Sequence, residues 1–550
     1  MRTLFSICLA ALMAIAIPAQ AQQKPEGKKK AKTDHAFNVG KNVNIFNALF
    51  TSLDLLYVDT LDTDELLKAA VDGMMDMLDP YTEYYPAEDM SDLEMLTTGK
   101  YGGIGSLIRM RKDSTVIIGE PYADMPAAEV GLKVGDVLLN IDGTDLKGKN
   151  TSEVSDMLRG EPGTTFVLTV RRPGEKKTRD FHITRRKIHL PAIPYYGMLT
   201  EMPGGEQTGY IDLTQFTENC SADVRKAVIR LKEQGAHSLV LDLRGNGGGL
   251  LAEAVNIVGL FVPKGTKVVE TRGKVKAAEM TYTTQSQPLD LEMPIYVLVN
   301  GQTASAAEIV SGALQDLDRA TVVGVRTFGK GIVQSPRELP YDGSLKLTTS
   351  KYFLPSGRCI QAVDFKSIRE NGGDGRTPDS LATVFHTAQG RPVLDGCGII
   401  PDIEVKHDTM ANVVYYLSSD DVLVDWGTRY AQAHATLPPI ERFSVTDADF
   451  TQFKQMCHES GFKYDRISER RLAELKKSMQ FEGYYDEATP EFEALERKLE
   501  HNLDRDLDRH SEDIRRLMEA EVIKRYYYQA GTVQISLRGD KDIEAALKGK

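Results

Sequence analysis

The segment that decides the fold reads Pro294-Ile-Tyr-Val-Leu-Val-Asn-Gly-Gln-Thr-Ala-Ser305-Ala-Ala-Glu-Ile-Val310. An apolar run, a glycine turn and a serine before an alanine-rich stretch predict a strand, a tight turn and a helix over 306–317. That helix carries the chain roughly 18 Å away from Ser305. The next apolar run, 321–326, predicts a strand that returns it by about 20 Å. Lys330, just beyond that strand, is therefore expected near Ser305.

A second strand–turn–helix unit lies earlier in the chain. Its strand, Ser238-Leu-Val-Leu-Asp-Leu243, is an almost continuous apolar run, which is typical of a strand covered on both faces. The turn Gly245-Asn-Gly-Gly-Gly249 follows, and residues 251–261 predict a helix. Because strands and helices alternate in this way over 190–405, the sequence indicates an α/β layer architecture.

Ser305 admits two interpretations. With Glu308 it fits a capping box, in which serine and glutamate satisfy free amides at the start of a helix. It can also be a nucleophile, since the positive end of the helix dipole stabilises developing negative charge nearby. The amide of Ala306 would then point at the space in front of the hydroxyl. The two roles do not exclude each other, and the motif by itself leaves both open.

Lys330 also has two interpretations. The residues from Gly324 to Lys330 follow most of the phosphate-loop pattern, but Gly331 has no hydroxyl for magnesium and a strand-like run up to Pro336 stands where a helix is needed. Nucleotide binding is therefore not expected. As a general base, Lys330 needs a pKa about three units below the ordinary value of roughly 10.4. Burial can lower it in this way, and Gln334, on the same face of a strand, could orient the amine.

The glycine turn after the buried strand could supply the remaining catalytic need. A tetrahedral intermediate carries an oxyanion, and the loss of one hydrogen-bond donor to it costs about 2.7–4 kcal/mol. Backbone amides of the Gly245–Gly249 turn can approach such an anion closely, because glycine has no side chain. A tight turn without a ligand is the alternative.

A small module rich in strands is predicted between residues 98 and 187. Strands are expected at 116–118, 137–141 and 166–170, with an amphipathic helix over 151–158. A glycine loop before them offers successive amides to a terminal carboxylate, and the strand 106–110 beside it can pair with an extended peptide. The peptide-binding candidates belong to this loop and to the helix: Gly102, Gly103, Ile104, Gly105, Val154 and Leu158.

Composition and targeting signals narrow the class of protein. The chain has 550 residues and a net charge of −12, so several domains are expected and nucleic acid is a poor partner. No metal-binding motif occurs, so neither a metal nor another cofactor is expected. Arg2, a largely apolar run from Leu4 to Ile17 and a small-residue site at Ala19-Gln-Ala21 predict a signal peptide cleaved after Ala21. An uncleaved anchor is the alternative.

The remaining segments carry weaker signals. A stripe expected to be buried marks helical periodicity in the segment 38–96: Leu53, Leu56, Leu66, Leu67, Ala70, Met74 and Met77. Residues 362–396 form an apparent excursion with little regular pattern, flanked by Cys359 and Cys397, which could form a disulfide. Beyond about residue 407 the chain is predicted to be helical and highly charged.

Together these segments resemble the C-terminal processing, or tail-specific, peptidases, a family of exported serine proteases that carry a PDZ domain. The resemblance runs from about residue 45 to 405. The 362–396 excursion is longer than the minimal form of the family, and the helical region after 407 matches no motif of the family. The matching segments, in chain order, are Leu78-Asp-Pro-Tyr-Thr-Glu-Tyr84, Pro126-Ala-Ala-Glu-Val-Gly-Leu-Lys-Val-Gly-Asp136, Ile141-Asp-Gly143, Leu158-Arg-Gly-Glu-Pro-Gly-Thr164, Leu241-Asp-Leu-Arg-Gly-Asn-Gly-Gly-Gly249, the segment around Ser305, Gly329-Lys330-Gly-Ile-Val-Gln334, Tyr352-Phe-Leu-Pro-Ser-Gly-Arg358 and Gly398-Ile-Ile-Pro-Asp402.

The resemblance implies a role for each site residue. Ser305 is the implied nucleophile, Lys330 the general base and Gln334 its support, while the amides of Gly248 and Ala306 form the implied oxyanion hole. It also implies a layered α/β catalytic core of the crotonase or ClpP type with an inserted PDZ domain. The expected domains are a signal peptide 1–21, a flexible linker 22–36, an N-terminal helical segment 37–97, a PDZ domain 98–187, a catalytic domain 188–406 including the 362–396 excursion, and a C-terminal helical region 407–550.

The sequence therefore predicts an exported, periplasmic serine endopeptidase with a Ser-Lys dyad and no cofactor. Its expected partner is a protein or peptide substrate with a free, apolar C-terminus, and a homo-oligomer and an adaptor protein are further expected partners. A non-catalytic PDZ scaffold or periplasmic chaperone is the alternative from another class. An α/β hydrolase acting on acyl esters is disfavoured, because Thr303 and Ala307 stand where its nucleophile motif needs glycine.

Overall fold

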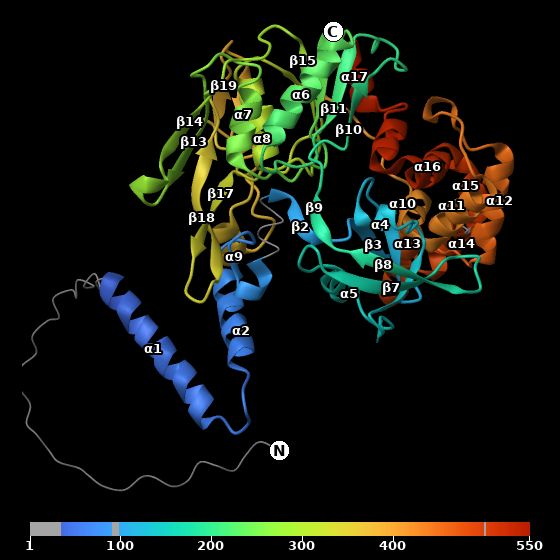
Figure 1. The fold of residues 1–550 in the computed structure, drawn as a ribbon, viewed down its shortest axis with the longest axis horizontal. Coiled ribbons are helices and arrows are strands. Elements are labelled where there is room, and N and C mark those ends of the chain that lie inside the picture. The colour runs from blue at the N-terminus through green and yellow to red at the C-terminus, as the bar shows by residue number, and fades with distance from the viewer. Residues whose placement is uncertain (1–34, 91–97, 500–501, 550) are drawn as a thin grey trace, which may run out of the picture. The chain divides into compact units, whose positions relative to one another are not determined.

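The computed structural model describes residues 35–90, 98–499 and 502–549 (Figure 1). The predicted signal peptide and nearly all of the linker lie outside the described residues. The chain divides into an N-terminal unit that ends at Gly73 and a large unit that begins at Met74. None of the described helices is long and apolar enough to cross a membrane.

The N-terminal unit is helical, as predicted, but its apolar stripe is not buried. Helix α1 (His35–Leu56) and helix α2 (Thr63–Met75) contain no buried residue, and Leu56 is 80% exposed. Helical periodicity shows which residues share a face, whereas burial also needs a surface that covers this face. The prediction of a buried stripe was therefore wrong for the single chain. The predicted helical segment also contains a short strand, β1 (Glu83–Tyr85).

A six-stranded sheet forms the centre of the α/β core, in the order β10-β11-β12-β15-β16-β21. The strands from β11 onward are parallel, and β10 pairs with β11 in the antiparallel direction. Both β12 and β15 are buried along their whole length, which confirms that they are covered on two faces. The strand bounds are β10 (Tyr195–Met198), β11 (Thr208–Asp212), β12 (Ser238–Asp242), β15 (Ile295–Val299), β16 (Thr321–Gly324) and β21 (Ile403–Glu404).

Helices cover this sheet on both faces, so the layered α/β prediction is confirmed. Helices α6 (Cys220–Glu233), α7 (Leu251–Val258) and α8 (Ala306–Asp316) share one apolar core with residues such as Leu241 and Val297 (Figure 1). On the other face, Ile543, Ala546 and Leu547 of the C-terminal helix α17 (Lys541–Lys548) pack against Val240 and Leu298. Helix α17 therefore completes the α/β core.

A second sheet lies beside the segments that carry Lys330. Its order is β1-β18-β13-β14, with β17 also paired to β18. The 362–396 excursion contains a helix, α9, and a hairpin, so the expectation of little regular structure there was wrong. The bounds are β13 (Lys267–Gly273), β14 (Met280–Thr283), β17 (Ile332–Glu338), β18 (Ser344–Phe353), α9 (Phe365–Asn371), β19 (Val384–His386) and β20 (Pro392–Leu394).

The strand-rich module is inserted between β1 and β10. It contains a six-stranded sheet, a separate β2–β9 pair and a helix, α5 (Thr151–Leu158), at the predicted position. The insertion is clear from the topology, because β1 before the module and β18 after it belong to one sheet. The strand bounds are β2 (Lys100–Gly103), β3 (Ser106–Met110), β4 (Val116–Pro121), β5 (Val137–Ile141), β6 (Thr144–Asp145), β7 (Thr165–Arg171), β8 (Thr178–Thr184) and β9 (Arg186–His189), and a short helix α4 (Pro126–Glu129) lies between β4 and β5.

The C-terminal region is helical, as predicted, and packs around the fully buried Trp426. Its first long helix, α11, contacts the inserted module through apolar and ionic groups. Val424 packs against Ile117 and Val137, and Arg111 donates two hydrogen bonds to Asp425, of 2.7 and 2.9 Å. The bounds are α10 (Asn412–Ser419), α11 (Asp421–Ala433), α12 (Asp447–Glu459), α13 (Ile467–Glu482), α14 (Thr489–Leu499), α15 (Leu503–Arg509) and α16 (Ser511–Ser536).

Candidate active site

Ser305 lies in a tight turn between β15 and α8, at the carboxyl end of the central sheet. It precedes the first residue of α8. Its backbone has φ 57° and ψ −116°, a conformation that residues other than glycine rarely adopt. Such a backbone costs on the order of 1–3 kcal/mol and persists only where the surroundings hold it in place. The backbone N–H of Ser305 donates to the Glu308 carboxylate at 2.9 Å, which is one half of the predicted capping box.

Lys330 lies in the loop between β16 and β17, where it is partly buried. Burial lowers its pKa to about 8, and the positive charge of Lys346 acts in the same direction. This is the direction that a general base requires. Its Nζ atom lies 4.0 Å from the centroid of the Tyr81 ring. The environment is less apolar than predicted, because Asp79, Glu83 and Glu308 approach from other elements and raise the same pKa.

Tyr81 belongs to a segment for which sequence reasoning assigned no role in catalysis. Its ring also packs edge-on against Phe365 of α9, and Arg369 of α9 donates to the Leu78 carbonyl. The 362–396 excursion therefore supports the residue that covers Lys330. The sequence marked residues 78–84 only by their resemblance to a family segment. The contact between Tyr81 and Lys330 could not be predicted, because residues some 250 positions apart share no local periodicity.

The glycine turn approaches Ser305 as predicted. A Cβ atom added to Gly248 would lie 2.8 Å from the Cβ of Ser305 and 2.9 Å from the amide nitrogen of Ala306. The predicted oxyanion contact, however, is not preformed at Gly248, because its amide donates to Asn246 Oδ1 at 2.8 Å. The Asn246 side chain is fully buried and also donates to the Leu213 carbonyl at 2.7 Å. Local side-chain bonding of this asparagine competes with the predicted role.

The amide of Ala306 occupies the first position of α8, where intrahelical bonding leaves amides without a partner. It therefore remains the better placed of the two predicted oxyanion donors.

Gln334 does not hold Lys330 by a hydrogen bond in the described structure. Its Nε2 donates to Thr348 Oγ1 at 3.0 Å, and that hydroxyl in turn donates to Asp79 Oδ1 at 3.1 Å. Lys330 and Gln334 were predicted to share one face of a strand. This prediction fails because Lys330 precedes β17 and the β17–β18 register shifts between Val333 and Gln334. Gln334 is therefore joined to the segment that covers the lysine, rather than to the lysine.

The inserted module has a groove of about 410 Å³ between β3 and α5. Of the predicted peptide-binding residues, Gly103, Ile104 and Leu158 line it. Val154 is fully buried in the core of the module, so its assignment to the groove was wrong. Apart from Leu158, the residues of this helix that line the groove are polar: Thr151, Ser152, Ser155 and Asp156.

The two remaining loop glycines are needed for close packing. A Cβ on Gly102 would lie 2.1 Å from the Gly160 carbonyl oxygen, and one on Gly105 would lie 2.5 Å from the Met125 side chain. Neither belongs to the groove lining.

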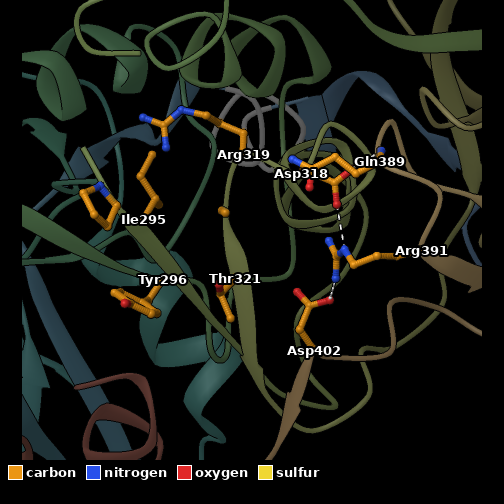
Figure 2. A pocket seen from close by; sticks show the side chains of 10 residues that line it. Ile295, Tyr296, Asp318, Arg319, Thr321, Gln389, Arg391 and Asp402 are labelled. Atoms are coloured by element: carbon orange, nitrogen blue, oxygen red, sulfur yellow. Dashed lines mark hydrogen bonds and ion pairs between the residues drawn. The ribbon is translucent and has the colours of Figure 1, made fainter. Parts of the chain in front are cut away.

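Figure 2 shows a different cavity, of about 290 Å³, at the amino ends of β15 and β16. Its lining includes Ile295 and Thr321, which begin these strands, whereas Ser305 follows the end of β15. Its main charges are paired, since Arg391 binds both Asp318 and Asp402. This cavity is therefore separate from the Ser305 turn.

The described part of the chain contains neither a metal-binding cluster nor a disulfide between the two cysteines that flank the 362–396 excursion. Within residues 35–90, 98–499 and 502–549, no group of three or more histidine, cysteine or acidic side chains could hold a metal ion. Cys359 and Cys397 are free thiols, so the possible disulfide between them is not formed.

Comparison with known proteins identifies the family and its domains. Residues 207–367 match the family model of peptidase family S41, residues 117–172 match a PDZ domain, and residues 413–549 match the model described as "Probable PDZ-protease, C-terminal helical domain". The chain is 37% identical over 335 residues to a carboxy-terminal-processing protease of Bartonella bacilliformis, over 60% of this chain and 75% of that protein.

Two further relatives are similar. The chain is 36% identical over 337 residues to a probable CtpA-like serine protease of Staphylococcus aureus, over 61% of this chain and 65% of that protein. Among solved structures, the photosystem II D1 C-terminal processing protease is 27% identical, over 66% of this chain and 92% of that one, with a TM-score of 0.36.

These findings define a serine protease with a PDZ domain inserted into its catalytic core. The chain belongs to the carboxy-terminal-processing proteases of peptidase family S41.

Proposed function

We propose that this protein is an exported endopeptidase that binds the apolar C-terminal tail of a protein substrate in its PDZ groove and cleaves the chain with Ser305 and Lys330. The observation that best supports the dyad is the Glu308 carboxylate. It accepts hydrogen bonds from the backbone N–H groups of both residues, at 2.9 Å each, although they are far apart in the sequence.

In the proposed reaction, Ser305 Oγ attacks the carbonyl carbon of the scissile peptide bond. Neutral Lys330 Nζ accepts the hydroxyl proton and later donates it to the leaving amine. The amide of Ala306 binds the oxyanion, and the amide of Gly248 joins it once the Asn246 side chain releases it. Water then attacks the acyl carbon while Lys330 takes a proton from it, and the ester bond breaks as this proton passes to Ser305 Oγ.

The PDZ groove supports recognition of a tail. The strand side presents Leu107 and Ile108, and the loop end presents Ile104 and Tyr101, so an apolar terminal residue has a matching surface. The polar side of α5 suits hydroxyl or amide groups farther up the tail.

Export is proposed from the leader described above, and a periplasmic location is part of the same proposal.

Cleavage of a defined tail tests the proposal. The mature chain, residues 22–550, is incubated with an unfolded polypeptide that ends in a free apolar carboxylate and with the same polypeptide amidated. Wild-type protein should cleave the free tail faster than the amidated one, and Lys330→Ala should cleave neither. Binding without cleavage by the wild type would favour the alternative, a non-catalytic PDZ scaffold or chaperone.

A homo-oligomer and an adaptor remain part of the proposal. Helix α1 supports it, because several large apolar side chains on it are exposed, including Phe37, Val43, Phe46 and Leu49. Sedimentation of the mature chain should give more than one copy per particle. A monomer at micromolar concentration would leave an adaptor as the partner, to be sought by its effect on the cleavage rate.

A further inference from the structure

A single buried carboxylate connects the turn of Ser305 to the loop of Lys330. Glu308 is fully buried, and each of its oxygens accepts two hydrogen bonds. Oε2 accepts from the backbone N–H of Ser305 and of Lys330, at 2.9 Å each, while Oε1 accepts from Thr327 Oγ1 at 2.5 Å and from Gly329 N–H at 2.8 Å. All four acceptor sites of the carboxylate are thereby used.

The same two residues are also joined at their carbonyl groups. The hydroxyl of Tyr352, which is 1% exposed, lies 3.2 Å from the Ser305 carbonyl oxygen and also donates to the Lys330 carbonyl oxygen. Because a hydroxyl has one proton, the two carbonyls share it. Ser305 and Lys330 are thus connected twice, through N–H groups to Glu308 and through C=O groups to Tyr352.

We propose that Glu308 and Tyr352 are positioning residues that fix the distance between nucleophile and base. The inference rests on the proposed Ser305 and Lys330 chemistry. Ser305 has a strained backbone, which persists only where its surroundings hold it, and these two side chains hold both of its peptide groups. A misplacement of about 1 Å in a catalytic group can lower the rate by roughly a hundredfold.

A cap for α8 alone does not explain this arrangement. One acceptor oxygen is enough to cap a helix, and helix caps are usually exposed. Glu308 is instead removed from water, and burial raises its pKa to about 7. Because the pKa of Glu308 is higher in the folded protein than in the unfolded chain, the folded state loses stability as the pH rises between these two values. Ionised Glu308 therefore costs stability at neutral pH. A costly group with partners on both catalytic segments fits a role in positioning.

The ionic surroundings of Lys330 supply a readout that packing alone would not change. The groups that face it are Lys346 on β18, Glu83 on β1, Asp79 and Tyr81 before β1, and Glu308 on α8. The charge of Glu308 favours protonated Lys330. Neutralising Glu308 should therefore move the acid limb of kcat/KM to lower pH, while removing the Tyr352 hydroxyl changes no charge.

Tyr352→Phe is the first test, because it deletes a single hydroxyl. We expect kcat to fall by about ten- to a hundredfold with KM unchanged. The matched control is Tyr464→Phe, which deletes another buried hydroxyl, bonded to Asp506 Oδ2 at 2.5 Å in the C-terminal region, and should keep full activity. Wild-type kcat in correctly folded Tyr352→Phe would overturn the role of Tyr352.

Glu308→Gln is the second test. The variant keeps the size of the side chain but lacks the charge and one of the two double-acceptor oxygens. We expect a lower kcat together with a shift of the acid limb to lower pH. An unshifted limb with wild-type kcat would overturn the role of Glu308. If Glu308→Gln does not fold, Tyr352→Phe still decides the proposal, and full activity of Lys330→Ala would instead show that the proposed dyad is wrong.

Discussion

Lys330, the proposed base, can act only in its neutral form, so in the proposed mechanism its surroundings decide the pH at which the site works. Burial lowers its pKa to about 8, and Lys346 contributes in the same direction. The fraction of neutral amine, and with it kcat/KM, should rise with pH through about 8 and level off above that value. The acid limb of the pH profile is therefore a direct measure of this residue.

The first prediction concerns Lys346. Lys346→Gln removes a positive neighbour of Lys330 and the ion-pair partner of Glu83, and both changes raise the pKa of Lys330. The acid limb of kcat/KM should therefore move to higher pH, with lower activity at pH 7. Lys346→Arg retains the charge and serves as the control. A limb at the same pH in Lys346→Gln would contradict the proposed electrostatic role of this neighbour.

The second prediction compares two adjacent glycines. Gly248 has a φ of +98°, and a Cβ there would lie 2.8 Å from both Ser305 Cβ and the Ala304 carbonyl oxygen. Gly248→Ala should therefore abolish cleavage by displacing the nucleophile turn. A Cβ on Gly247 would meet no atom within 4 Å, so Gly247→Ala should retain activity. The measurement is kcat/KM of both variants, and comparable activity in both would refute the close approach.

At the scale of elements, the segment before β1 acts on a loop far along the chain. Tyr81 covers Lys330, and its neighbour Thr82 contacts β18 through a hydrogen bond from the Thr348 amide, at 3.2 Å. Phe365 of α9 packs against the Tyr81 ring. Tyr81 therefore covers one side of Lys330, and α9 supports the Tyr81 ring.

The third prediction tests this cover. Tyr81→Ala admits water to Lys330 and should raise its pKa toward the ordinary value of about 10.4. The Tyr81 ring also stabilises the protonated amine, so its loss would by this effect lower the pKa of Lys330. The loss of burial should outweigh this effect, because burial is the largest influence on this pKa. Cleavage at pH 7 should fall and recover partly at higher pH. Tyr81→Phe keeps the ring and should retain the wild-type profile; an acid limb displaced equally in both variants would argue against burial as the cause.

Local elements could be predicted from the sequence because their signals are periodic or directly chemical. The strand–turn–helix around Ser305, the buried strand before the glycine turn and helix α5 all appear at the expected residues. Contacts over long sequence distances could not be predicted. The β17–β18 register shift redirects Gln334, and Glu308 looked like a cap, although it also accepts from the Lys330 amide. Exposure of α1 depends on what covers it, which periodicity does not specify.

At the scale of the whole large unit, the C-terminal helices hold the PDZ domain. Arg111 binds Asp425 with two hydrogen bonds, and Arg109 binds Asp421 at 2.8 Å. Val424 of the same helix packs on the PDZ sheet. The helical region therefore does more than cover the core, because it also contacts the domain that carries the groove.

The fourth prediction addresses this contact. Arg111→Ala removes a paired, mostly buried guanidinium and should lower the free energy of unfolding by about 1–2 kcal/mol, with faster hydrogen exchange in β3, β4 and α11. The control is Arg471→Ala, since that side chain is 75% exposed in its pair with Glu474 and such pairs contribute little. Exchange rates in Arg111→Ala that match the control would contradict a structural role for the contact.

Covalent labelling with a fluorophosphonate, which reacts with activated serine hydroxyls, tests most directly whether Ser305 is the nucleophile. Mature wild-type protein, Ser305→Ala and Lys330→Ala are each labelled at pH 9, and the modified residue is located by peptide mass. One label on Ser305 is expected in the wild type, none in Ser305→Ala and much slower labelling in Lys330→Ala. Equal labelling of wild type and Ser305→Ala, or a label on another residue only, would contradict it.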